Sequence, residues 1–485
     1  MSKRKVLILL LISMVLSASA TYFLLNWRWE ERVREQQDLL EIPDGGAQEN
    51  QDYLEKIGNA FHLIKTQYVG EVNEEKLTEG AIQGMLTVLN DPYSVYMNRE
   101  EASRFSESLD SSFEGIGAEI TKIDGKIIIV SPLKNSPAEK AGLKPYDQIL
   151  KVDGADVTNK ELNEVTLKIR GKKGTKVALE ILRNGLEKPI SVEVKRDTIP
   201  IETVYSSLEE ANGKKIGYIE ITSFSRDTGE EFADHLKKLE RKKIAGLIID
   251  VRGNPGGLLT SVEEIASQLI TGDKPIVQIE KKDGERETIF SKLKKRKGYP
   301  IAVLTDEGSA SASEILAAAL KEGEGYPVIG ERTFGKGTVQ QQISLGDGSN
   351  MKLTMYKWLT PNGNWIHGKG IEPDVEVEQP ALFHLQPLQL KGILKRDMND
   401  EQIKQAQFIL KELGYEPGRT DGYFDETTEA AVKVFQHDNQ LPETGVIDGK
   451  TAKTMEKVIL EEKENKANDR QLKTSLKYLS YMAEK

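Results

Sequence analysis

The sequence predicts a multidomain protein of the α+β class. With 485 residues the chain is too long for one ordinary domain, and its length suggests about three. From Lys215 onward strand and helix patterns alternate, and residues 245–251 are apolar throughout, as in a strand buried on both faces. Helical spacing of apolar residues dominates near both ends. We expect segments with the bounds 1–28, 29–50, 51–112, 113–198, 199–380, 397–460 and 461–485.

Composition excludes several classes of function. The formal net charge of −10 argues against nucleic acid as the main partner. The chain has no cysteine, which excludes disulfides, thiol nucleophiles and cysteine–zinc sites. Its five histidines are scattered without an HExxH pattern or a close pair. We therefore expect neither a metal site nor an organic cofactor.

The N-terminal segment, residues 1–28, predicts a membrane anchor. Residues 3–5 are basic, and residues 6–25 form an uncharged, mainly apolar run that is long enough to cross a bilayer. The basic cluster favours a cytoplasmic N-terminus, so the rest of the chain would lie on the extracytoplasmic side. The alternative is a cleaved signal peptide, because residues 18–20 are small-x-small. We prefer the anchor because the apolar run continues for five residues past that site.

Residues 29–50 are charged and end in a Pro-Asp-Gly-Gly sequence, which is typical of a linker. Between residues 51 and 112 the apolar spacing predicts two helices, of which the second ends at Asp91-Pro92. The stripe on the first helix is most simply a core face, and a dimer seam is the second interpretation. Its members are Leu54, Ile57, Phe61, Ile64 and Tyr68.

Residues 113–198 resemble a PDZ domain. A GIGA loop leads into strands, SPAEKAGL forms a short helix, and a second helix spans about residues 159–169. The resemblance implies that loop N–H groups bind the terminal carboxylate of a peptide, which adds as a strand beside the loop. The candidate peptide-binding residues are Gly115, Ile116, Gly117 and Ala118 in the loop, and Leu162, Val165 and Ile169 on the helix.

Arg170 ends that helix beside a glycine. A guanidinium can exchange one carboxylate or carbonyl partner for another, so we hypothesise that Arg170 links peptide occupancy to catalysis. The alternative is an exposed charge that stabilises the C-terminus of the helix.

The strongest chemical signal lies between residues 299 and 340. A strand pattern leads into a small-residue turn and then an alanine-rich helix, so Ser311 is expected at a helix start. Unpaired N–H groups and the helix dipole would stabilise an oxyanion there. Twenty-five residues later Lys336 lies between two glycines. Burial lowers the pKa of a lysine, so Lys336 is a candidate base for the serine.

GSASASE at 308–314 and FGKGTVQ at 334–340 together resemble the signature of the C-terminal processing peptidases, or tail-specific proteases. The resemblance implies that Ser311 is the nucleophile, that Lys336 is the base and that Gln340 orients the lysine. The turn RGNPGG also resembles the family, which implies an oxyanion hole made by the N–H of Ala312 with that of Gly256 or Gly257. His367 is a rival base, because the spacing does not show whether it reaches the serine.

Residues 397–460 contain LGY, DGYF, AVKVFQ and GVIDGKT in an order that resembles the three-helix peptidoglycan-binding module. Peptidoglycan is therefore an expected partner, although such a fold can also serve as a scaffold. The tail, residues 461–485, predicts a terminal helix that seeks a partner, such as another subunit in a homodimer. Its thin apolar stripe comprises Leu472, Leu476, Leu479 and Met482.

These features predict an extracytoplasmic serine endopeptidase that needs no cofactor. It would bind envelope or secreted proteins by their C-terminal tails and cleave them, with a role in proteolytic signalling. The alternative is an inactive adaptor that tethers partners through the PDZ and wall-binding modules. The intact serine and lysine motifs favour the enzyme.

Overall fold

The structure is a computed structural model that describes residues 47–123, 125–183, 186 and 188–484. Contacts divide the chain into two compact units, one ending at Val88 and the other beginning at Leu89. The expected membrane segment, residues 6–25, lies outside the described residues. Within the described part of the chain, every helix is too short or too polar to cross a bilayer.

The first unit contains two helices, α2 (Ala47–Gln67) and α3 (Glu74–Thr87). Helix α3 begins where the side chain of Asn73 accepts a hydrogen bond from the N–H of Lys76, at 2.9 Å. The helical spacing of the sequence is thus confirmed. Most of the stripe on α2 is exposed within this unit, so it forms no core there; the exposed members are Leu54, Ile57, Ile64 and Tyr68.

Residues 118–195 form a separate antiparallel sheet with its own core. The strand order is β3-β4-β5-β7-β8, with β6 beside β5, so β3 lies at an edge that is open to strand addition. The core contains Ile129, Ile149, Val177 and Leu179. The elements are β3 (Ala118–Ile123), β4 (Lys126–Pro132), α5 (Pro137–Lys140), β5 (Gln148–Val152), β6 (Ala155–Asp156), α6 (Leu162–Ile169), β7 (Lys176–Leu182) and β8 (Ile190–Lys195).

The two ends of this domain are hydrogen-bonded to one another. Strand β2 (Ser112–Gly115) enters the domain, β9 (Asp197–Pro200) leaves it, and the two pair in an antiparallel ribbon. Helix α4 (Arg99–Leu109) precedes the ribbon and begins with a capping box formed by Asn98 and Glu101. The domain is therefore an insertion in the second unit, attached through a two-stranded connection.

The central sheet of the second unit has the strand order β10-β11-β12-β15-β16-β19. Only the β10–β11 pair is antiparallel. Side chains alternate between the faces: Leu247 and Ile249 join one core cluster, and Ile248 joins another. The strands are β10 (Val204–Ala211), β11 (Lys214–Ile221), β12 (Gly246–Asp250), β15 (Ile301–Thr305), β16 (Val328–Gly330) and β19 (Val375–Glu376).

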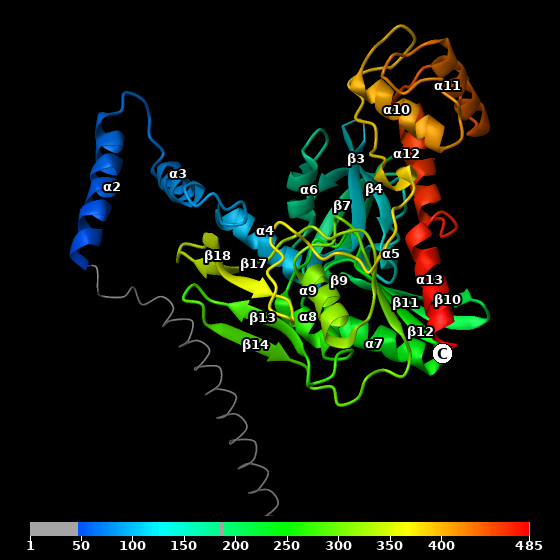
Figure 1. The fold of residues 1–485 in the computed structure, drawn as a ribbon. Helices are drawn as coiled ribbons and strands as arrows, with labels where there is room; N and C mark the ends of the chain where they lie inside the picture. Colours follow the sequence, from blue (N-terminus) through cyan, green and yellow to red (C-terminus); the bar gives the residue numbers. More distant parts are fainter. Residues whose placement is uncertain (1–46, 124, 184–185, 187, 485) are drawn as a thin grey trace, which may run out of the picture. The chain divides into compact units, whose positions relative to one another are not determined.

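Helices cover both faces of this sheet (Figure 1). On one face lie α7 (Thr228–Arg241), α8 (Leu259–Ala266) and α9 (Ala312–Ala318), and α9 continues as the π-helix η2 (Ala319–Gly323). On the other face lies the C-terminal helix α13 (Arg470–Met482), drawn in red.

The apolar stripe on the C-terminal tail has a partner within this chain. Leu472 and Leu479 of α13 are buried against Ile248 and Leu304 of the central sheet. Leu476 packs against the same cluster. This differs from the expectation that the stripe meets another subunit: a parallel sheet is apolar on both faces, and α13 covers the second one.

A second, smaller sheet has the order β1-β18-β13-β14, with β17 also paired to β18. Strand β1 (Val95–Met97) comes from a segment in which the sequence predicted only helices, and three residues are too few to show a period of two. Its pairing with β18 joins the segment that precedes the PDZ domain to the segment that follows the lysine motif. The other strands are β13 (Pro275–Glu280), β14 (Arg286–Phe290), β17 (Thr338–Ser344) and β18 (Asn350–Leu359).

After β19 and the 3-10 turn η3 (Ala381–His384), the chain forms three helices around Phe424 and Phe435, as predicted: α10 (Glu401–Glu412), α11 (Glu426–Asp438) and α12 (Gly449–Glu464).

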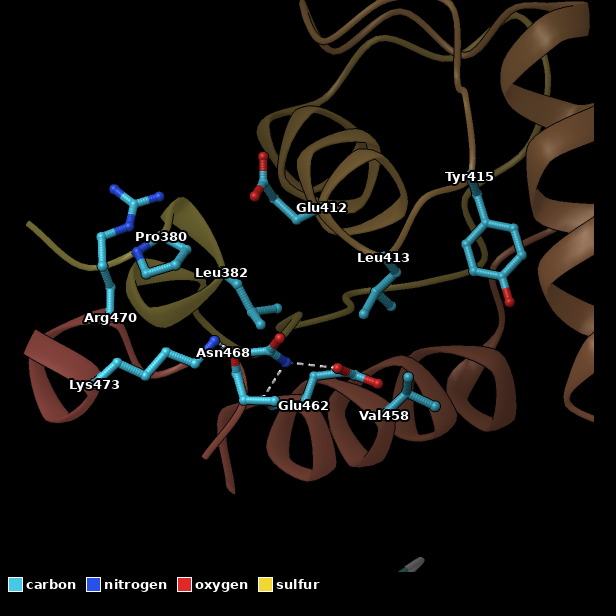
Figure 2. A pocket seen from close by; sticks show the side chains of 11 residues that line it. Pro380, Leu382, Glu412, Leu413, Tyr415, Val458, Glu462, Asn468, Arg470 and Lys473 are labelled. Carbon is cyan, nitrogen blue, oxygen red and sulfur yellow. Dashed lines mark hydrogen bonds between the residues drawn. The ribbon is translucent and has the colours of Figure 1, made fainter. Parts of the chain in front are cut away.

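A cavity of about 580 Å³ lies where this three-helix module meets the start of α13 (Figure 2). At its edge the amide of Asn468 donates a 2.7 Å hydrogen bond to the carboxylate of Glu462. Most of its lining is labelled in the figure and includes Leu382, Leu413, Tyr415, Val458 and Arg470.

Candidate active site

Ser311 lies in the turn between β15 and α9, directly before the first helical residue. Its φ of 55° and ψ of −109° lie in a region that L-residues rarely adopt, so the surrounding structure must hold it there. The turn is anchored at both sides of the serine. The Ala310 N–H and the Ser313 hydroxyl both donate to the carbonyl oxygen of Asn254, at 3.0 and 2.8 Å. The serine turn is thereby held against the glycine turn that follows β12.

In that glycine turn Gly256 lies directly behind the serine. A Cβ atom at Gly256 would lie 2.9 Å from the Cβ of Ser311, and the φ of +103° also favours glycine. The Gly256 N–H donates to the side-chain oxygen of Asn254 at 2.8 Å, so it is already occupied. Among the described residues, no acceptor lies within hydrogen-bonding range of the N–H of Gly257 or of Ala312. These two N–H groups are free to stabilise an oxyanion.

The carboxylate of Glu314 connects the serine turn with the lysine loop. Its side chain is fully buried. One oxygen accepts from the Thr333 hydroxyl and the Gly335 N–H, both at 2.7 Å. The other accepts from the N–H groups of Ser311 and Lys336, both at 2.8 Å. Because both N–H groups bind one oxygen atom, the backbones of Ser311 and Lys336 are held side by side.

The amine of Lys336 lies in an environment that favours its neutral form. Burial lowers the pKa of Lys336, and the nearby ammonium of Lys352 lowers it further. The carboxylates of Asp91 and Glu314 act in the opposite direction without cancelling this effect. The Lys336 Nζ atom lies 4.9 Å from the centre of the Tyr93 ring. A lysine with a lowered pKa can act as a general base closer to neutral pH.

The side chains of the predicted catalytic set have other hydrogen-bond and ring contacts in the described part of the chain. In the described part of the chain, no hydrogen bond joins the Lys336 Nζ to the Ser311 Oγ or to Gln340. The amide of Gln340 instead donates to the hydroxyls of Thr338 and Thr354, both at 3.0 Å. The fold thus brings the backbones of Ser311 and Lys336 together, although among the described residues no hydrogen bond joins the hydroxyl to the amine.

His367, the rival base, has other partners. Its Nδ1 accepts a 3.3 Å hydrogen bond from the Gly337 N–H. Its ring stacks on Trp365, with 5.2 Å between the ring centroids. The ring also meets that of Tyr93 edge-on, with 6.4 Å between the centroids. These contacts fix the imidazole through Nδ1, and in the described part of the chain no hydrogen bond joins it to Ser311.

The predicted carboxylate-binding loop runs from Gly115, the last residue of β2, to Ala118, the first residue of β3. Gly117 has a φ of +71°, and a Cβ there would lie 2.6 Å from the Cβ of Ser136, so glycine is required. Among the described residues, the N–H groups of Ile116 and Gly117 have no acceptor. Unpaired N–H groups beside an open strand edge suit the binding of a peptide carboxylate.

The three predicted pocket residues on α6 differ in exposure. Val165 and Ile169 are buried in the core of the PDZ domain, whereas Leu162 is partly exposed beside that core. Leu162 is therefore the one of the three that a bound peptide would contact most directly.

Arg170 contacts helix α4. Its Nη1 lies 2.6 Å from a carboxylate oxygen of Glu107, and its guanidinium lies 4.9 Å from the centre of the Phe113 ring. The arginine therefore connects the end of α6 to the segment that precedes the PDZ domain. Both partners of the ion pair are substantially exposed, at 38% and 48% of their side-chain surface.

Sequence reasoning missed three residues of the site: Glu314, Tyr93 and Lys352. Glu314 had a local signal, since an acid three residues after a serine at a helix start matches a capping box. Tyr93 directly follows Asp91-Pro92, which indicated only the end of a helix. Lys352 had no signal, because its position in the site depends on long-range strand pairing, in which β18 lies between β17 and β1.

An α/β core with a strained serine beside two unpaired N–H groups and a half-buried lysine, together with a peptide-binding domain, defines a serine peptidase that recognises peptide tails. The chain matches peptidase family S41 over residues 215–377, a PDZ domain over 115–194 and a putative peptidoglycan binding domain over 399–455. Residues 14–101 match the N-terminal domain of the activating protease CtpB.

Known relatives narrow this class to one family. The chain is 56% identical to the carboxy-terminal processing protease CtpB of Bacillus subtilis over 426 residues, which cover 88% of this chain and 89% of the relative. It is 45% identical to CtpA of the same organism, with coverage of 88% and 90%. It is 39% identical to a probable CtpA-like serine protease of Staphylococcus aureus, with coverage of 87% and 84%. The chain belongs to the carboxy-terminal processing proteases of family S41, which confirms the resemblance.

Proposed function

We propose that the chain is an endopeptidase in which Ser311 and Lys336 form the catalytic dyad. Ser311 Oγ attacks the scissile carbonyl carbon, and its proton passes to the neutral amine of Lys336. The N–H groups of Gly257 and Ala312 stabilise the oxyanion. The ammonium then protonates the leaving amine, and a water that gives its proton to Lys336 hydrolyses the acyl-enzyme.

The observation that carries this proposal is the shared acceptor of the two motifs. The N–H groups of Ser311 and Lys336 both bind one oxygen of the buried Glu314. A lysine that served only as a surface turn would need no such link to the serine. The lowered pKa of Lys336, caused first by burial and then by Lys352, supports its role as the base.

The position of the amine suggests that this geometry is a resting one. Lys336 lies over the ring of Tyr93, and Gln340 binds Thr338 and Thr354. Catalysis then requires Lys336 to rotate toward Ser311, where Gln340 can orient it. We propose that a substrate tail bound in the PDZ domain favours this rearrangement and that Arg170 responds to it through its ion pair with Glu107.

The remaining expectations concern location and partners. We propose that residues 6–25 anchor the enzyme in the cell membrane as a single span, with the catalytic domain on the extracytoplasmic side. Its substrates are then envelope or secreted proteins. The three-helix module suits binding to peptidoglycan, and the exposed stripe on α2 suits a homodimer.

The dyad is tested with the purified chain and an unfolded protein substrate. Ser311→Ala and Lys336→Ala should each abolish cleavage, whereas His367→Gln should retain it. The His367 variant is the matched control, since it changes the rival base in the same region. Equal cleavage by the parent and both dyad variants would show that a contaminant cuts the substrate and would favour the adaptor function.

A further inference from the structure

The C-terminal helix α13 packs along the central sheet, and its N-terminus also contacts the glycine turn beside Ser311. Its N-cap residue is Asp469, whose carboxylate accepts a 2.8 Å hydrogen bond from the Leu472 N–H. The same carboxylate binds Arg252, the first residue of the RGNPGG turn, through two hydrogen bonds of 3.0 and 2.8 Å. A paired contact of this kind fixes the orientation of the guanidinium as well as its position.

Arg252 is held from both sides. Its Nε donates to both carboxylate oxygens of Asp250, at 3.0 and 2.9 Å, and its Nη1 also donates to the side chain of Gln471 at 3.0 Å. Only 15% of the arginine side chain and 11% of that of Asp469 are exposed. Burial alone would lower the pKa of Arg252, but the carboxylates of Asp250 and Asp469 raise this pKa well above its ordinary value.

A second set of contacts fixes Asp469 and its neighbours in the sequence. The amide of Gln379 donates to Asp469 at 2.8 Å, and the amide of Gln471 donates to Glu331 at 3.1 Å. Asn468, directly before Asp469, is bound to Glu462 at the end of α12 (Figure 2). The carboxylate that binds Arg252 is therefore held in place by several hydrogen bonds on both sides of it in the sequence.

The turn that begins at Arg252 carries the backbone that faces the nucleophile. Four residues after Arg252, Gly256 lies against Ser311, and the next N–H, that of Gly257, has no acceptor among the described residues. The start of the turn is also held by Asp306, which accepts the Gly253 N–H at 2.8 Å. A shift of Arg252 would move this turn relative to the serine.

We propose that Asp469 is a positioning residue for the oxyanion hole, so the segment that follows the wall-binding module completes the active site of the protease. Through Arg252 it fixes the turn that presents the Gly257 N–H. This inference rests on the proposed function, because it takes the Gly257 and Ala312 N–H groups as the oxyanion donors. Asp469 touches neither substrate nor serine and acts only through Arg252.

The test replaces Asp469 in the full chain by Asn and, separately, by Ser. Both residues are good N-caps, so α13 still starts correctly. The Asn side chain keeps one oxygen that can accept from Arg252, whereas the Ser side chain is too short to reach Arg252. The fall in kcat should therefore be larger for Ser than for Asn. We expect kcat for a peptide substrate to fall about tenfold or more with KM unchanged, because displacement of about 1 Å in a catalytic group can cost a hundredfold.

A second readout separates positioning from stability. A peptide aldehyde forms an adduct whose oxyanion needs the same donors, so its affinity should fall in parallel with kcat. Binding of the same peptide with a free carboxylate should not change. The control is Glu372→Gln, which breaks a 2.6 Å ion pair with Arg332 that is 60% and 62% exposed and should leave kcat unchanged.

A lower melting temperature with the parent kcat and the parent aldehyde affinity, in both Asp469 variants, would overturn the inference and leave Asp469 as a helix cap. The outcome is distinct from failure of the proposed function. If Ser311→Ala or Lys336→Ala cleaves as fast as the parent, the dyad is wrong. If they are inactive while both Asp469 variants cleave normally, only the positioning role is wrong.

Discussion

Replacement of Gly256 by alanine should disable the catalytic step while the fold survives. The new methyl group would lie 2.8 Å from the carbonyl oxygen of Ala310, 2.9 Å from the Cβ of Ser311 and 3.0 Å from the N of Ala312. Ordinary contacts between such atoms are roughly 3.5–4.0 Å, so the two turns must separate by about 1 Å. Separation of that size removes the Gly257 N–H from the oxyanion, which costs about 100- to 1000-fold in kcat.

The φ of +103° at Gly256 adds backbone strain of about 1–3 kcal/mol, which should appear as a lower melting temperature. The matched control is Gly253→Ala in the same turn. Gly253 also has a positive φ, of +63°, but nothing lies within 4 Å of a Cβ there. Steady-state cleavage of a peptide by both variants, with melting curves, separates strain from displacement. If Gly256→Ala kept a kcat within threefold of Gly253→Ala, the proposed role of the turn would be refuted.

Two further variants test the lysine and its support. Lys352→Met removes a positive charge that lowers the pKa of Lys336, so that pKa should rise and the acidic limb of the kcat–pH profile should move to higher pH. Lys357→Met, on the same strand and paired with Glu280, is the control and should not move the limb; equal shifts in both variants would contradict the local effect. Glu314→Gln places an NH₂ group opposite N–H groups that now donate to the carboxylate. Each buried N–H group that loses its acceptor costs about 1–3 kcal/mol, so the melting temperature and kcat should both fall. Parent values for both would show that Glu314 does not hold the two loops.

The sequence predicted those parts of the site that depend on short motifs. A serine among small residues before an alanine-rich helix requires a tight turn at a helix start, and the structure has Ser311 at that position. The glycines around Lys336 let its loop pack closely against residues 365–370, since a Cβ at Gly335 would lie 3.0 Å from the N of Gly370 and one at Gly337 would lie 2.8 Å from the N of His367. The helices of the terminal module also followed from local spacing, because a period of 3.6 residues is visible in a single segment.

Long-range pairings had no local signal. Arg252 and Asp469 are separated by 217 positions, and neither residue type indicates a partner at that distance. The sequence could not show whether Gly256 or Gly257 supplies the free N–H group. The side chain of Asn254 accepts the hydrogen bond of the Gly256 N–H, so only the Gly257 N–H is left for an oxyanion. The apolar stripe of α13 predicted burial correctly, but a stripe does not say which surface covers it.

Helix α13 follows the strands of the central sheet in the sequence, and this sets an order of events during biosynthesis. The ribosome releases the N-terminal side of a protein first, and segments fold as they emerge. The central sheet receives the helix for its second face only when residues 470–482 have been made. Arg252 likewise meets Asp469 only after the ribosome has added the 217 positions that separate them. With the proposed role of Asp469, a protease assembled in this way becomes fully active only after the module that precedes α13 has been synthesised.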